Sequence, residues 1–580
     1  MTGGRRHMLD IVIRNATLVD GTGAPARTAD IGVKDGLIAE VGRVDTPARR
    51  EIDAAGRMVT PGFVDIHTHY DGQASWDPLL APTSLNGVTS IAMGNCGVGF
   101  APARPDRHDW LIALLEGVED IPGTALAEGL TWDWESFPDY LDALGRRQFA
   151  LDVAAHLPHA ALRTYVMGDR GGDHREHPTE AEIAEMARLT EEALGAGALG
   201  FTTSRTFVHR SRSGENIGTL EAGRAELLGI AAAMRRAGKG VIQLISDAYL
   251  TADDEFATQE LDLIEALARE SGRPLSFTVQ QTDEAPDRFR HIFARVAGMV
   301  AEGLDVKCQV APRPIGVIQG LEATLNPFLF CPEWRRIGAL ALAEKVAELR
   351  RPEVRARLLE QHAQIWPEGF GTQIAHGFDR MFRVSDPVDY EPTADRSIAA
   401  EAERAGVSPA ELMLDLLCEE EGHRLLYMPL INYARGSLSD VHAMMTAPNT
   451  LYGLSDGGAH CGTICDASFP TSTLAIWAKG NRAGARIPVE ELVHGLTQRN
   501  AAHVGWTDRG VVAPGMRADL NILDMEALAV PPPELVKDLP AGGGRLVQRP
   551  RGIAMTMCRG EITFEAGAPT GVLPGRLIRA

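Results

Sequence analysis

The feature that most constrains this fold is the stretch Pro-Gly-Phe-Val-Asp-Ile-His-Thr-His at residues 61–69. Pro61 and Gly62 mark its entry, and the apolar residues that follow are typical of a buried strand. Because side chains alternate along a strand, His67 and His69 point to the same face. Two imidazoles held side by side on a rigid strand can bind one divalent metal ion. The stretch therefore predicts a metal site at the end of a strand.

The composition excludes several classes of protein. The 580 residues are 44% hydrophobic and 23% charged, which suits a large barrel with accessory elements. The formal net charge of −21 argues against nucleic acid or an anionic membrane as the main partner. Seven cysteines without CxxC spacing predict no disulfide framework and a reducing, cytoplasmic location. The start of the chain lacks the apolar core of a signal peptide, and no apolar run is long enough for a membrane span. Whether the chain forms a homo-oligomer stays an open question at this point.

The two ends of the chain both have the pattern of short β-strands. Residues 9–60 show short apolar runs joined by turns, with Lys34-Asp-Gly36 as a hairpin turn. Similar runs return near the other end, at 518–523 and 553–557. Such strands cannot bury both of their faces alone. We therefore predict one small β-sandwich domain that is built from residues 1–60 together with residues 506–580.

The middle of the chain, residues 61–505, alternates apolar strands with helical patterns, which is typical of parallel βαβ units. This predicts an α/β fold, a (β/α)8 TIM-like barrel inserted into the sandwich, with its site at the C-terminal strand ends. A helical insertion at 321–423 interrupts the rhythm before the last strand and suggests a lid, a substrate-selecting subdomain or an oligomer contact. After 61–69, the predicted strands are 90–93, 150–154, 198–201, 241–245, 275–279, 305–310 and 450–454.

Two further strand ends carry residues that can bind a metal. Cys96 stands in Gly94-Asn-Cys-Gly-Val-Gly99, where flanking glycines allow close backbone approach after the second strand. Thiolate sulfur is a good zinc ligand. Asp456 stands in Ser-Asp-Gly after the last strand, at the seam where a closed barrel brings that strand beside the first. We therefore expect both side chains near His67 and His69.

These motifs together resemble the amidohydrolase superfamily, in particular its D-aminoacylase (N-acyl-D-amino-acid deacylase) branch. The resemblance covers the stretch 61–69, Gly-Asn-Cys-Gly at 94–97, Ser-Asp-Gly at 455–457 and Pro-Gly-Met-Arg-Ala-Asp-Leu at 514–520. It implies that zinc is held by His67, His69, Cys96 and Asp456.

The chain departs from the family pattern at three strands. The family places one histidine each on strands five and six, but here those strands end in Gln-Leu-Ile-Ser-Asp247 and Val-Gln-Gln-Thr-Asp283. No lysine ends the fourth strand. Asp247 or Asp283 could supply an oxygen ligand, but glutamine and serine are poor zinc ligands. We therefore expect one zinc ion per chain, held by His67, His69 and Asp456 with Cys96 as a fourth ligand or close neighbour. The missing imidazoles count against a second ion.

The resemblance implies a zinc-dependent hydrolase that cuts an amide bond of a small-molecule N-acyl substrate, such as an N-acyl-D-amino acid. Asp456 is then the general base and later the general acid. One metal and one carboxylate serve a cyclic amide or imide hydrolase, or a deaminase, equally well. A non-catalytic scaffold is a further alternative, although the retained ligands count against it. The candidates for substrate contact are polar residues near other strand ends, namely His159, Arg205, Arg313 and His460.

Overall fold

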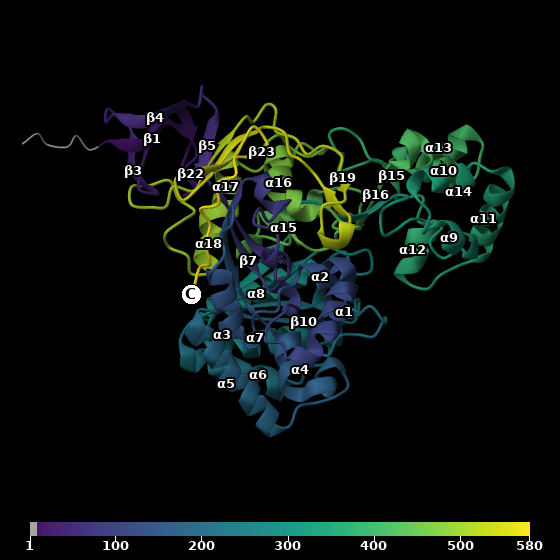
Figure 1. The fold of residues 1–580 in the computed structure, drawn as a ribbon, viewed down its shortest axis with the longest axis horizontal. Helices are drawn as coiled ribbons and strands as arrows, with labels where there is room; N and C mark the ends of the chain where they lie inside the picture. Colours follow the sequence, from purple (N-terminus) through teal and green to yellow (C-terminus); the bar gives the residue numbers. More distant parts are fainter. Residues whose placement is uncertain (1–7) are drawn as a thin grey trace, which may run out of the picture.

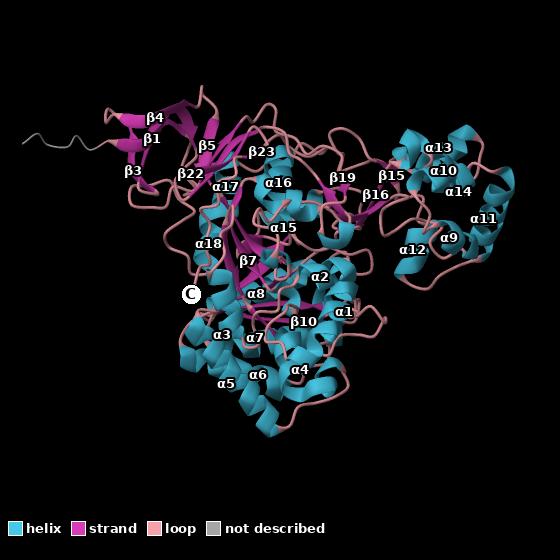
Figure 2. Ribbon diagram, viewed as in Figure 1, coloured by secondary structure: helices cyan, strands magenta, loops and turns pink. Residues whose placement is uncertain are grey.

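The computed structural model describes residues 8–580 and has an α/β fold (Figures 1 and 2). Residues 1–7 lie outside this range. They include the start of the predicted 1–60 segment and part of the stretch to which the expectation of no signal peptide applies. From residue 8 onward, none of the helices combines the length and the apolar character that crossing a membrane requires.

Within the described residues, one nine-stranded sheet contains strands from both ends of the chain. Strand β5 (Met58–Pro61) pairs antiparallel with β18 (Leu520–Leu523), so that Val59 lies opposite Ile522. The two ends lie together at the upper left of Figure 1, purple beside yellow. The other strands of this sheet are β1 (Leu9–Leu18), β2 (Arg27–Lys34), β3 (Leu37–Gly42), β4 (Ala48–Asp53), β21 (Ile553–Cys558), β22 (Glu561–Glu565) and β23 (Ala568–Pro569).

The hairpin predicted at Lys34–Gly36 is confirmed. Strands β2 and β3 pair antiparallel around it, and both Asp35 (φ 51°) and Gly36 (φ 80°) adopt the left-handed conformation. Two consecutive residues with positive φ match the right-handed twist of the paired strands. One difference concerns β1: in place of the short runs expected here, Leu9–Leu18 form a single ten-residue strand with a bulge between Ile13 and Ala16.

The expected parallel strands of the middle segment are present and run in two sheets. In each sheet neighbouring strands are parallel, and an isolated bridge joins Thr68 to Gly457 across the seam between the first and last strands. These sheets are consistent with a barrel, whereas the division into domains stays a prediction. The strands are β6 (Phe63–Thr68), β7 (Val88–Met93) and β8 (Asp152–Ala155), then β9 (Leu157–Pro158), β10 (Gly200–Arg205), β11 (Val241–Ser246), β12 (Leu275–Thr278), β13 (Val306–Val310) and β17 (Thr450–Tyr452).

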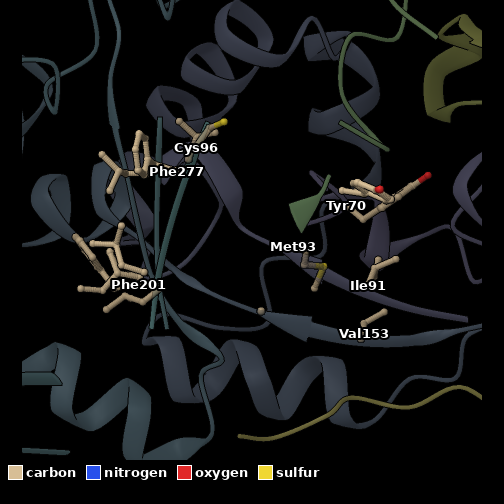
Figure 3. Packing of buried hydrophobic residues seen from close by; sticks show 14 of the residues in the cluster. Tyr70, Ile91, Met93, Cys96, Val153, Phe201 and Phe277 are labelled. Atoms are coloured by element: carbon tan, nitrogen blue, oxygen red, sulfur yellow. The ribbon is translucent and has the colours of Figure 1, made fainter. Parts of the chain in front are cut away.

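The helices between these strands have clear start and stop signals. In α5 (Glu180–Ala196), Thr179 and Glu182 form a reciprocal capping box, and Gly197 ends the helix at φ 106°. Buried helix residues such as Leu194 of α5 belong to the same hydrophobic core as the strand residues Ile91, Met93 and Val153, which Figure 3 shows. The other helices of this layer include α1 (His108–Glu119), α4 (His159–Met167), α6 (Arg224–Ala237), α7 (Asp254–Ser271), α8 (Arg288–Ala301), α15 (Ser439–Met445), α16 (Phe469–Trp477), α17 (Val489–His494) and α18 (Asn500–His503).

The segment between β13 and β17 forms a lobe on the right of Figure 1 with a hydrophobic core of its own, which includes Phe328, Leu358 and Leu417. It is helical as predicted, but it is attached through an antiparallel three-stranded sheet that the sequence pattern did not predict. That sheet consists of β14 (Ile315–Gln319), β15 (Phe382–Arg383) and β16 (Leu426–Ile431), and the helices are α9 (Pro332–Ile337), α10 (Leu342–Leu349), α11 (Pro352–Gln364), α12 (Phe370–His376), α13 (Ile398–Ala405) and α14 (Pro409–Leu417).

The shared sheet predicts that a core residue from one chain end stabilises strands from the other. Leu520 in β18 is 0% exposed, whereas Leu37 in β3 is 44% exposed. Leu520→Ala should cost about 2–5 kcal/mol, as core truncations of this kind do. It should also speed amide hydrogen exchange in β1 and β2.

Hydrogen exchange followed by mass spectrometry measures this directly, with Leu37→Ala as the matched control. If Leu520→Ala leaves exchange in residues 9–34 unchanged, the two ends do not form one cooperative unit.

Candidate metal centre

Strand β6 directs its histidines as the alternation pattern predicts. All six of its residues are buried, and Val64 and Ile66 pack in one hydrophobic cluster whereas Phe63, which alternates to the face of His67, packs in another. The backbone N–H of His69 donates to Gly457 O at 2.8 Å, across the seam with the last strand. This closure brings Asp456 beside the two imidazoles, although more than three hundred residues separate them in sequence.

Ligand atoms from four side chains converge at this seam. His67 Nε2 lies 3.3 Å from Cys96 Sγ and 3.3 Å from Asp456 Oδ1, and His69 Nε2 lies 3.5 Å from Asp456 Oδ1. The ligand atoms of His67, His69 and Cys96 are all within 4.8 Å of one another. Two ligands of one tetrahedral zinc ion are roughly 3.3–3.6 Å apart, given Zn–N of about 2.0 Å and Zn–S of about 2.3 Å. The donor atoms of His67, His69 and Cys96 therefore suit a single metal ion, and Asp456 Oδ1 lies beside both imidazoles.

The charge balance of the cluster also favours a bound cation. Burial lowers the pKa of His67 to about 4 and that of His69 to about 3, so both rings are neutral near pH 7. Burial, together with the nearby Glu119 and Asp456 carboxylates, raises the pKa of the Cys96 thiol well above its usual value. A coordinated metal reverses this effect, because it deprotonates the thiol outright.

The loops that present Cys96 and Asp456 have unusual backbones. Cys96 has φ 53° and Asp456 φ 47°, a left-handed conformation that costs free energy in residues other than glycine. Gly97 allows the Cys96 turn to approach β10, because a Cβ at this position would lie 2.7 Å from Thr203 Cα. Local strain of this kind concentrates at functional sites.

Two oxygen atoms outside the donor set lie against the far side of the imidazoles. Gln309 Oε1, from β13, lies 2.8 Å from His67 Nδ1. Glu119 Oε1, from the C-terminal end of α1, lies 3.2 Å from His69 Nδ1. Sequence analysis did not single out Glu119, because a glutamate near the end of an amphipathic helix has no motif that separates it from a solvent-exposed one.

The strand ends that lack the family histidines place their polar groups differently. Gln243 of β11 reaches the centre: its Oε1 accepts a hydrogen bond from Cys96 N at 3.4 Å. Asp247 instead accepts from Phe207 N at 2.8 Å, and burial raises its pKa to about 6. Asp283 forms an ion pair with Arg380 of the insertion. In this structure neither aspartate joins the four donors.

Three of the four predicted substrate contacts have partners inside the chain. His159 contacts Thr203 Oγ1 at 2.8 Å and Glu226 Oε1 at 3.0 Å. Arg205 forms a 2.7 Å ion pair with Glu260. Their contact with a substrate stays a prediction, but the structure gives both side chains a buried structural partner.

Arg313 is the clearest departure from expectation. Only 1% of Arg313 is exposed. Its Nη1 donates a hydrogen bond to Asp466 at 2.8 Å, and its guanidinium group lies over the Tyr390 ring. Its remaining N–H groups donate to Ser472, Cys465 O, Ser468 and Pro314 O. No N–H group is left for the substrate contact that was predicted for Arg313, so the structure assigns this guanidinium to holding the loop after the last strand.

His460 is the predicted contact that does border the centre. It lines a cavity of about 20 Å³ together with Asp456, Gln73 and Arg545. Its Nε2 lies 3.8 Å from Glu119 Oε2. The cavity is far smaller than the roughly 300–1,000 Å³ of typical ligand sites. Its lining includes Asp456 but none of His67, His69 and Cys96, so it borders the donor cluster from the Asp456 side.

Comparison with known proteins decides the family. The sequence pattern described as "Amidohydrolase family" matches residues 50–564, most of the chain. The chain belongs to the amidohydrolase family. A second pattern, the N-terminal domain of the urease alpha-subunit, matches residues 2–62.

Relatives of this amidohydrolase include N-acyl-D-amino-acid deacylases. It is 26% identical over 520 residues to N-acyl-D-aspartate deacylase of Alcaligenes xylosoxydans xylosoxydans, covering 89% of this chain and 86% of that protein. It is 28% identical over 548 residues to an uncharacterised protein of Mycobacterium tuberculosis, covering 89% and 84%. A D-aminoacylase crystal structure matches with a TM-score of 0.65 and 24% identity, over 99% of this chain and 100% of that one. The predicted superfamily and branch are confirmed, as is an α/β fold of the D-aminoacylase type.

The buried Arg313 network predicts a large stability effect. Arg313→Ala leaves Asp466 buried without its partner, which should cost about 3–5 kcal/mol. Arg188 pairs only with Glu185 and Glu192 at the surface, and its side chain is 56% exposed. Arg188→Ala should cost less than about 1 kcal/mol.

Chemical denaturation without substrate measures both variants. An Arg313→Ala protein as stable as wild type contradicts the structural assignment and restores a substrate role for this side chain.

Proposed function

We propose that the chain is a metal-dependent hydrolase that cuts an N-acyl amide bond, with N-acyl-D-amino acids and related N-acyl compounds as its substrate class. The observation that carries the proposal is the convergence of His67, His69 and Cys96 within 4.8 Å of one another, with Asp456 Oδ1 at 3.3 Å from His67 Nε2 and 3.5 Å from His69 Nε2. The family and its deacylase relatives supply the bond type. The finer assignment of substrate and metal is the proposal.

The four donors would hold the ion between the first, second and last strands. When bound, zinc polarises the amide carbonyl and lowers the pKa of a water molecule toward about 7. Catalytic zinc sites keep one position open for water, whereas four protein ligands would close the site. Asp456 is the donor that water can most easily replace, because its side chain is 17% exposed while those of the two histidines are 1% exposed.

Asp456 would then move the protons. Its carboxylate accepts the proton of the attacking water and returns it to the departing nitrogen. Its neighbours keep it near the imidazoles: Gly457 is tied to His69 N at 2.8 Å, and Ser455 Oγ donates to Asp65. His460, at the cavity beside Asp456, is positioned to contact the substrate.

This proposal predicts one firmly held zinc ion per wild-type chain. His67→Ala should lose both the metal and the hydrolysis of N-acyl amides, because it removes the donor closest to Cys96 and Asp456. His423, whose side chain is 66% exposed, offers the matched control, and His423→Ala should keep both.

Elemental analysis and an activity panel test this, using N-acetyl-D-amino acids, their L-enantiomers and cyclic amides. Two firmly retained metals in the wild type would show that the centre is not mononuclear. Hydrolysis of cyclic amides alone would replace the N-acyl assignment.

A further inference from the structure

The buried carboxylate of Glu119 is unusual in its surroundings. Its side chain is 2% exposed, and the ionisable groups in contact with it are His69 at 3.2 Å and His460 at 3.8 Å. Among residues 8–580, no lysine or arginine pairs with it. His69 Nδ1 and Glu119 Oε1 are both buried without another hydrogen-bond partner. A buried carboxylate without a cation is costly, so this position requires an explanation.

The orientation of the imidazoles provides one. A histidine that binds metal through Nε2 carries its proton on Nδ1 and needs an acceptor there. For His67, that acceptor is Gln309 Oε1 at 2.8 Å. For His69, the atom in the same place is Glu119 Oε1, at 3.2 Å, and neither atom has another hydrogen-bond partner.

The end of α1 also holds the loop that carries Asp456. The backbone oxygen of Glu119 accepts from His460 N. The next residue, Asp120, accepts from Gly462 N at 3.0 Å. The C-terminal end of α1 thus contacts both His69, which directly follows strand β6, and the loop after the last strand. The buried face of α1, with Leu111, Leu114, Leu115 and Val118, fixes this end in place.

We infer that Glu119 is a positioning residue for the metal centre: it accepts the Nδ1–H of His69, keeps Nε2 directed at the ion and thereby sets the affinity for a divalent metal. The inference rests on the proposed metal centre. Burial, together with the nearby Asp456 and Asp71 carboxylates, raises the pKa of Glu119 well above its usual value. A bound cation favours the ionised carboxylate. An ionised acceptor raises the basicity of the ligand nitrogen, and loss of such outer partners typically weakens metal binding 10–100-fold.

Two substitutions separate the parts of this role. Glu119→Ala removes both acceptor and charge and should weaken zinc binding about 10–100-fold. Glu119→Gln keeps an acceptor oxygen but loses the charge, and its affinity should fall between those of Glu119→Ala and the wild type. Glu116, one turn earlier on the same helix, pairs with Arg212 at 2.9 Å at the surface. Glu116→Ala is the matched control and should bind zinc within about twofold of wild type.

Zinc affinity is measured by competition with a chromophoric chelator, and the visible spectrum of the cobalt-substituted protein reports ligand geometry. Glu119→Ala with affinity within twofold of wild type overturns the inference. If Glu119→Ala does not fold, Glu119→Gln decides: unchanged affinity and an unchanged cobalt spectrum overturn it as well. A wild-type protein that binds no divalent metal would instead refute the proposed centre itself.

Discussion

Desolvation of the side chains that we propose to bind the metal is the constraint on which the rest of this site depends. His67, His69 and Cys96 are buried away from water. Burial disfavours the charged forms of these groups, the imidazolium of histidine and the thiolate of cysteine. A divalent cation resolves the conflict, because it binds neutral imidazole and stabilises the thiolate. The left-handed backbones at Cys96 and Asp456 are consistent with this explanation, since strain persists only where the surrounding structure determines it.

Closure of the strand order is what brings the donors together. Asp456 reaches His67 only because the last strand lies beside the first, where His69 N donates to Gly457 O and Thr68 bridges the same residue. The end of α1 contacts both sides of this seam through Glu119, whose side chain lies beside His69 and whose backbone oxygen accepts from His460 N. Metal binding and closure should therefore support each other, because each holds the same two segments in place.

The four donors could be predicted because strand alternation and short motifs are local. His67 and His69 follow from a period of two, and Cys96 from its glycine-flanked turn. Glu119 could not be predicted, since its burial depends on how α1 packs at the strand ends. Arg313 shows the opposite limit: its position near a strand end was visible, but its partner Asp466 becomes a neighbour only through the tertiary fold. The antiparallel sheet that attaches the insertion could not be predicted for the same reason, because its strands pair although they lie far apart in sequence.

X-ray absorption at the zinc edge tests the central claim most directly, because it counts and identifies the ligands of the bound ion. The account predicts one sulfur at about 2.3 Å, from Cys96, and nitrogen or oxygen ligands at about 2.0–2.2 Å. It predicts no metal–metal distance near 3.5–4 Å, the spacing of two-metal sites. A first shell without sulfur, or a clear metal–metal distance, would contradict a single zinc ion held by these four side chains.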